Sequence, residues 1–125
     1  MLFPEPRGSI PWITVEQMVA VDRAMVEDFG ITLTQMMENA GRCLAEVARR
    51  RFLGTDASYT RVTVLAGSGG NGGGALVCAR RLEGWGADVR VALTRPDDDF
   101  EGVPARQLSI LKTIGIPVTV GPPAG

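Results

Sequence analysis

The 125-residue sequence has no histidine, two cysteines, one tyrosine and one lysine. The lack of histidine excludes Ser-His and Cys-His nucleophilic designs and the most common zinc sites. Acid–base chemistry would therefore depend on carboxylates, Tyr59, Lys112 or bound water. Cys43 and Cys78 fall on predicted helices without a metal-binding spacing. We expect both to be small buried residues in a reducing compartment, which favours the cytoplasm.

Long apolar segments and a strong excess of charge are also missing. No segment is long enough to cross a membrane, and the N-terminus lacks the layout of a signal peptide. The net charge of −1 gives no electrostatic reason to expect nucleic acid or an anionic membrane as a partner. The one basic run, Arg49-Arg50-Arg51, falls at the end of a predicted helix, where it complements the helix dipole. The length suits one domain with a real core.

Glycine, in contrast, is concentrated in residues 67–74, where it occupies six of eight positions. An apolar run at 61–66 precedes this segment and a helical pattern at 75–82 follows it. A strand, a glycine loop and a helix in this order present backbone N–H groups and a positive helix end to an anion. We therefore predict a phosphate- or nucleotide-binding loop, with a flexible turn that binds nothing as the alternative. The predicted binding residues are Gly67, Gly69, Gly70, Asn71, Gly72, Gly73 and Gly74.

The usual dinucleotide fingerprint is incomplete. The second predicted strand ends in Thr94-Arg95 instead of the acidic residue that binds a ribose hydroxyl, and no P-loop lysine follows the glycines. Arg95 could meet a 2′-phosphate, but we favour a solvated loop arginine. The carboxylates at 97–99 could hold a metal, although a solvated start of the following helix is the favoured interpretation.

The order of elements predicts an α/β fold. Residues 1–13 contain three prolines and are expected to form an extended arm. Two amphipathic helices are expected next, one from Thr14 to Gly30 and one from Thr32 to Gly54, because each starts with a capping-box pattern. In the second helix we expect an apolar stripe, with its methionines as adaptable core packing; the stripe comprises Met36, Met37, Ala40, Leu44, Val47 and Phe52. The remaining expected elements are strands at 61–66, 88–93 and 117–120 and helices at 73–85 and 103–114.

Handedness restricts the topology. Two right-handed crossovers in the same direction give a parallel sheet of order 3-2-1 with both crossover helices on one face. We expect the two N-terminal helices to cover the other face, which makes a three-layer α/β/α sandwich, half of a doubly wound sheet. The first strand would then be an apolar edge. A second copy, a separate chain or a further region is expected to complete it.

Two motifs resemble a known family. Residues 37–42, Met-Glu-Asn-Ala-Gly-Arg, are similar to "LMENAGR", and residues 67–77 resemble "GPGNNGGDGLV". The chain is on this basis similar, over about residues 14–120, to the YjeF N-terminal domain family, which includes NAD(P)H-hydrate epimerases. The resemblance implies a Rossmann-like half-domain over residues 14–125 and hydrated NADH or NADPH as the ligand, epimerised from the R to the S form. It also implies a potassium ion near the loop at Asn71, and substrate contacts at residues 70–74.

The sequence departs from the family pattern within the loop. Gly70 stands where the family has an asparagine and Gly74 where it has an aspartate, and the later "DALLGTG"-like segment has no counterpart. Glycine cannot replace a carboxylate that handles a proton or an ion. We therefore interpret the chain as a degenerate or incomplete epimerase domain that acts as a binding or association module. The alternative is an active epimerase once a partner or a longer chain completes it. Glu38 and Asn39 are the remaining polar candidates. For both we favour a helix-surface hydrogen bond that fixes the loop, with catalysis as the alternative.

Overall fold

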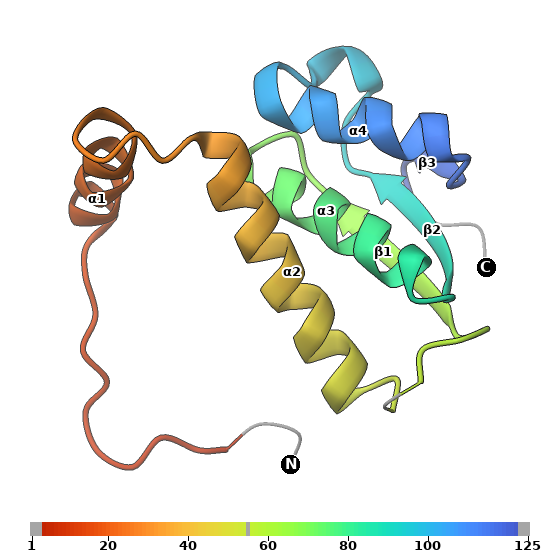
Figure 1. Ribbon diagram of the computed structural model, residues 1–125, viewed down its shortest axis with the longest axis horizontal. Coiled ribbons are helices and arrows are strands. Elements are labelled where there is room, and N and C mark those ends of the chain that lie inside the picture. The colour runs from red at the N-terminus through yellow and green to blue at the C-terminus, as the bar shows by residue number, and fades with distance from the viewer. Residues whose placement is uncertain (1–3, 55, 123–125) are drawn as a thin grey trace. The chain divides into compact units, whose positions relative to one another are not determined.

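The computed structural model describes residues 4–54 and 56–122. The chain divides into two compact units, Met1–Leu33 and Thr34–Gly125, and Figure 1 shows the elements of each. Among the described residues, the first unit contains one helix, α1 (Val15–Glu27). The other elements follow in the order α2 (Leu33–Arg51), β1 (Arg61–Ala66), α3 (Gly70–Gly84), β2 (Asp88–Leu93), the short 3-10 helix η1 (Asp97–Asp99), α4 (Gly102–Ile114) and β3 (Val118–Val120).

The predicted capping box begins α1. The Gln17 N–H donates to the Thr14 hydroxyl oxygen over 3.1 Å, and the Thr14 N–H donates to the Gln17 side-chain oxygen over 2.8 Å. These two bonds satisfy N–H groups that a helix start otherwise leaves without acceptors. No residue of α1 is buried, although the helix carries an apolar stripe.

The sheet is parallel, with β1 and β3 at its edges and β2 between them. Val64 is paired with Val91, and Val91 with Val118. This is the predicted order 3-2-1, so the α/β class and the strand order are confirmed. The reason is that short β-branched strands alternate with helices along the chain, and strands connected in this way pair in parallel.

One face of the sheet carries the core. Side chains of alternate strand residues, including Val64, Val91 and Leu93, pack with leucines of α3 and α4 such as Leu76 and Leu111. The residues between them point to the other face. There Thr63 and Arg90 are exposed, and Leu65 is 64% exposed.

The second helix packs beside α3 (Figure 1) and does not cover that other face, so our expectation for α2 was wrong. A Cβ on Gly41 would lie 2.4 Å from the Val77 Cβ, which shows how closely the two helices approach. Ala45 of α2 also belongs to the core cluster on the helical face. The physical reason is the glycine on each helix, which lets the backbones approach and bury α2 against a neighbouring helix.

The expected apolar stripe of α2 is therefore divided. Met37 is buried, whereas Leu44, Val47 and Phe52 are exposed. Cys43 is exposed too, which corrects the expectation that both cysteines are buried. Cys78 is buried, and loss of solvation raises the pKa of its thiol to about 11. Within the described residues, none of the helices has the length and apolar character needed to cross a membrane.

Candidate functional site

The glycine-rich segment connects β1 directly to α3. Helix α3 begins at Gly70, three residues earlier than its sequence predicts, and Gly69 is its N-cap in an extended conformation. No side chain caps this end. The N–H groups of the first turn, at Gly70, Asn71 and Gly72, have no acceptor within the helix. Because Gly69, Gly70 and Asn71 are exposed, the N–H groups of Gly70 and Asn71 and the positive end of the helix dipole are open to an anion, whereas Gly72 is buried.

Gly72 forms the tightest point of the loop. A Cβ there would stand 1.7 Å from the Gly67 carbonyl oxygen. None of the loop glycines has a positive φ, so the turn depends on the small size of glycine and not on a left-handed backbone. This close approach brings the start of α3 back over the end of β1.

The floor of the loop comes from α2. A Cβ on Gly73 would lie 2.4 Å from the Met37 sulfur, and one on Gly41 would lie 2.6 Å from the Gly74 carbonyl oxygen. Gly70 and Gly74 differ, since an added Cβ at either would meet no atom within 4 Å. The two glycines that depart from the family pattern are therefore not required by packing.

The carboxyl edge of the sheet adds a hydroxyl group that sequence reasoning missed. The Thr94 N–H donates to the Ala66 carbonyl over 3.0 Å, and a Cβ on Gly67 would lie 3.7 Å from the Thr94 hydroxyl oxygen. Thr94 therefore lies beside the start of the loop. Arg95 forms an ion pair with Asp99, with 3.7 Å between the nearest atoms, which agrees with the solvated interpretation of that arginine.

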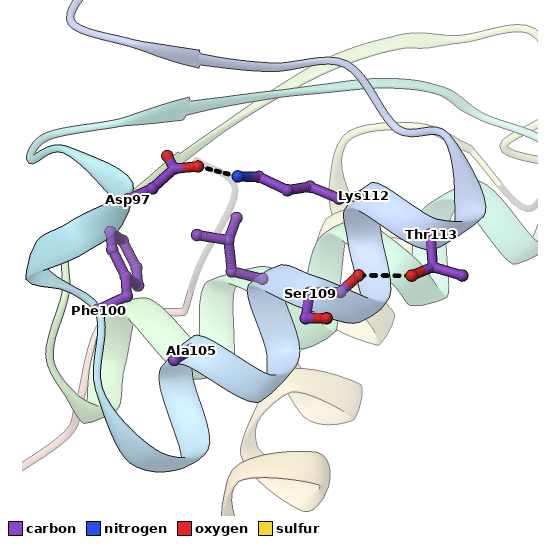
Figure 2. A pocket seen from close by; sticks show the side chains of 7 residues that line it. Asp97, Phe100, Ala105, Ser109, Lys112 and Thr113 are labelled. Carbon is purple, nitrogen blue, oxygen red and sulfur yellow. Dashed lines mark hydrogen bonds and ion pairs between the residues drawn. The ribbon is translucent and has the colours of Figure 1, made fainter.

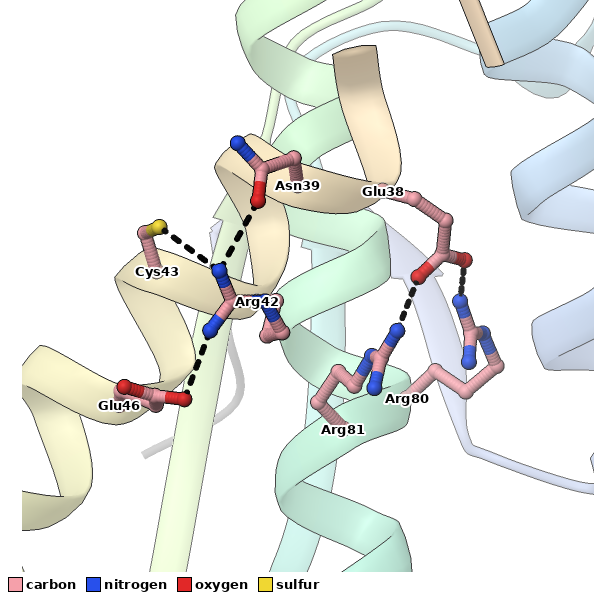
Figure 3. A network of polar contacts seen from close by, with 7 residues as sticks. All are labelled: Glu38, Asn39, Arg42, Cys43, Glu46, Arg80 and Arg81. Atoms are coloured by element: carbon pink, nitrogen blue, oxygen red, sulfur yellow. Dashed lines mark hydrogen bonds and ion pairs between the residues drawn. The ribbon is translucent and has the colours of Figure 1, made fainter. Parts of the chain in front are cut away.

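A polar network joins α2 to α3 (Figure 3). The carboxylate of Glu38 accepts hydrogen bonds from Arg80 and, over 2.7 Å, from Arg81. Burial, followed by the neighbouring charge of Arg81, lowers the pKa of Arg80. The Asn39 side-chain oxygen accepts a hydrogen bond from Arg42 of the same helix over 2.9 Å. Both polar candidates of the sequence therefore make structural contacts. Glu38 contacts two arginines that follow it in the sequence by 42 and 43 positions.

Two hollows of the surface lie away from the glycine loop. One, of about 510 Å³, lies between η1 and α4, where Lys112 pairs with Asp97 above Phe100 (Figure 2). A second, of about 330 Å³, is lined by residues of α2 together with Arg81. Neither of these two hollows includes a residue of the glycine loop.

The other sequence candidates do not gather at the loop. Asp97 and Asp99 are each paired with a cation, and the described residues contain no cluster of three or more metal-ligating side chains of the His, Cys, Asp or Glu type. Tyr59 precedes β1 and is 94% exposed, whereas the loop follows β1. The two therefore lie at opposite ends of that strand.

Known proteins resemble this chain in sequence and in fold. The NAD(P)H-hydrate epimerase of Dehalogenimonas lykanthroporepellens is 48% identical over 103 residues, which are 82% of this chain and 41% of that protein. The bifunctional NAD(P)H-hydrate repair enzyme Nnr of Moorella thermoacetica is 35% identical over 103 residues, 82% of this chain and 19% of that enzyme. The crystal structure of yeast ynu0, YNL200c, matches with a TM-score of 0.76 and 28% identity, covering 89% of this chain and 47% of that one.

The chain thus spans less than half the length of each of these relatives. A family model described as "YjeF-related protein N-terminus" matches residues 33–124, from the start of α2 to beyond β3. The α/β arrangement, the glycine turn and these similarities lead to one conclusion: the chain belongs to the family of YjeF-related N-terminal domains.

Proposed function

We propose that this chain binds the phosphates of NAD(P)H, or of its hydrate, at the glycine loop and acts as a binding and association module. The carrying observation is the uncapped first turn of α3. Gly70 and Asn71 are exposed at this positive helix end, where their N–H groups have no acceptor within the helix and no side chain caps them. Asn71 is also the residue we propose for a potassium ion, because its side-chain oxygen is a hard ligand beside the loop.

The identities of the relatives support a nucleotide ligand. Two relatives named for NAD(P)H-hydrate are 35% and 48% identical to this chain over 82% of its length. The loop nevertheless has glycine at positions 70 and 74, where a side chain would fit. A carboxylate at this place could hold a proton or an ion, and glycine does neither. Binding without turnover is therefore the function that the residues support best.

The open edge of β1 supports the association part of the proposal. In the described sheet β1 pairs only with β2, and Leu65 on the uncovered face is exposed. An apolar strand edge is a place where another strand adds by backbone hydrogen bonds. We propose that a second copy, another chain or a further segment occupies it. Light scattering that finds a folded monomer at micromolar concentration would contradict a second copy as the occupant.

The binding part is tested by a charge placed at the cradle. Gly70→Asp adds a carboxylate at an exposed helix start, where it suits the dipole and meets no atom within 4 Å. We expect the affinity for NADPH to fall about tenfold relative to the neutral Gly70→Asn variant, because the new charge repels phosphate. Titration calorimetry measures the affinity, and thermal unfolding shows that neither variant loses stability.

Equal affinities of the Asp and Asn variants would place the nucleotide elsewhere, and no heat from the unaltered chain would contradict the proposal directly. The alternative function is an active epimerase in a completed assembly, which the 48% identity to a named epimerase favours. Interconversion of the R and S forms of hydrated NADPH by the unaltered chain, followed by chromatography, would support that alternative.

A further inference from the structure

The contact between α2 and α3 consists of two different kinds of interaction. Towards the start of α3, the contact is between glycines and their neighbours: Gly41 lies against Val77, and Met37 lies against Gly73. One turn beyond Val77, Glu38 binds Arg80 and Arg81. All three residues of α2, at positions 37, 38 and 41, fall within little more than one helical turn.

The glycine contact alone does not fix the position of α3 along its axis. Side-chain ridges that fit into grooves usually set the register of two packed helices. Where glycines replace the ridges, the backbones approach closely but have few side chains to interlock. A second, directional interaction is therefore needed to set the register between α2 and α3.

Glu38 supplies that interaction. Its carboxylate accepts from two guanidinium groups on consecutive residues, and charge-assisted bonds of this kind are directional. The three side chains are only 25–35% exposed, so solvent screens the interaction less than at an open surface. Removing the carboxylate would leave two neighbouring positive charges partly buried and without their shared partner.

We propose that Glu38 is a positioning residue for the glycine loop, because it fixes the register between α2 and α3 that keeps Met37 beside Gly73, below the N–H groups that form the anion cradle. The proposal rests on the proposed phosphate binding for its functional part. Met37, the residue before Glu38, contacts Gly73 at the base of the cradle. A shift between α2 and α3 therefore removes Met37 from its place against Gly73.

The chain offers a matched control for this role. Glu46 also forms ion pairs, with Arg42 over 2.9 Å and Arg50 over 3.7 Å, but all three residues lie on α2. Glu38→Gln and Glu46→Gln therefore make the same chemical change. Only the first removes a connection to α3.

The first measurement needs no ligand. The Gly73 N–H donates to the Gly69 carbonyl over 2.9 Å, so its hydrogen exchange reports on the closing bond of the first turn. We expect Glu38→Gln to speed exchange at Gly73 about fivefold or more, and Glu46→Gln to leave it unchanged. Arg81→Gln should reproduce the Glu38→Gln effect, and the double variant should add little, since one interaction is removed in both.

The second measurement is the dissociation constant for pyrophosphate. We expect Glu38→Gln to weaken binding about fivefold at a temperature where both variants are fully folded, with Glu46→Gln equal to the unaltered chain. Equal exchange rates and affinities in the two variants would overturn the positioning role. If the unaltered chain binds no pyrophosphate, the proposed function fails, and exchange at Gly73 still decides whether Glu38 sets the register.

Discussion

A methyl group added at Gly72 would stand 1.7 Å from the Gly67 carbonyl oxygen, whereas one at Gly74 would meet no atom within 4 Å. The two glycines lie in the same helix, and both are buried. Their different surroundings separate two roles of glycine in this loop. At Gly72 the residue is required by the approach of two backbone segments, and at Gly74 it only leaves space unoccupied.

This contrast predicts opposite effects of one substitution. Gly72→Ala is expected to destabilise the fold by about 3 kcal/mol, since the clash is with backbone that cannot move aside. Gly74→Ala is expected to stabilise it by about 0.5–1 kcal/mol, because alanine loses less backbone entropy in a helix. Urea unfolding of the two variants measures both values. Similar losses in both would show that Gly74 has a packing role as well.

At the scale of elements, α3 begins with residues that disfavour a helix, yet it lies at the centre of the packing. Four of its first five residues are glycine, yet it packs against β1, β2, α2 and α4. Its hydrophobic contacts begin at Leu76 and Val77 and hold the helix in place. Tertiary packing thereby extends the helix back to Gly70, against the low helix propensity of glycine.

A capping residue at the uncapped start of α3 should therefore raise the stability of the fold and lower the affinity for phosphate. Gly69→Ser places a hydroxyl at an exposed, extended N-cap where an added Cβ meets no atom. We expect a gain of about 0.5 kcal/mol in the free energy of unfolding, since serine accepts from an N–H of the first turn. The same bond competes with phosphate. Thermal unfolding and NADPH titration of one protein preparation measure both effects, and a stability gain without loss of affinity would contradict a ligand at these N–H groups.

The sequence predicted the elements better than their contacts. The sheet and both crossovers were predictable because β-branched runs mark the strands and a glycine, Gly86 or Gly115, follows each crossover helix. Gly115 ends α4 with a positive φ. The side of the sheet that α2 covers was not predictable, because an amphipathic stripe does not say which neighbour it meets. Glu38 and the arginines of α3 are more than 40 positions apart, and no local pattern connects them. Thr94 has no motif that marks it.

At the scale of the whole molecule, the two units differ in how much they bury. The unit Met1–Leu33 has no buried residue in α1, whereas Thr34–Gly125 holds the core cluster. Hydrophobic burial is the main source of folding free energy. The stability of the chain therefore resides in its second unit.

Deletion of residues 1–30 is expected to preserve the fold. The core cluster, which extends from Ala45 to Ile116, stays complete, so the free energy of unfolding should change by less than about 1 kcal/mol. Denaturant unfolding compares the shortened and the full chain, with the slope of the transition as a measure of the surface that folding buries. A shortened chain without a cooperative transition would show that the first unit contributes to the fold.

Lys112, which pairs with Asp97 at the hollow beside α4, is the only lysine of the chain. The other twelve basic residues are all arginines, which stay charged and do not react as amines. Reagents and enzymes that modify side-chain amines therefore have a single target, Lys112, which is paired with the carboxylate of Asp97 in η1. A label attached to Lys112 would report on one place in the fold, the contact between η1 and α4. Its signal would not be an average over many labelled side chains.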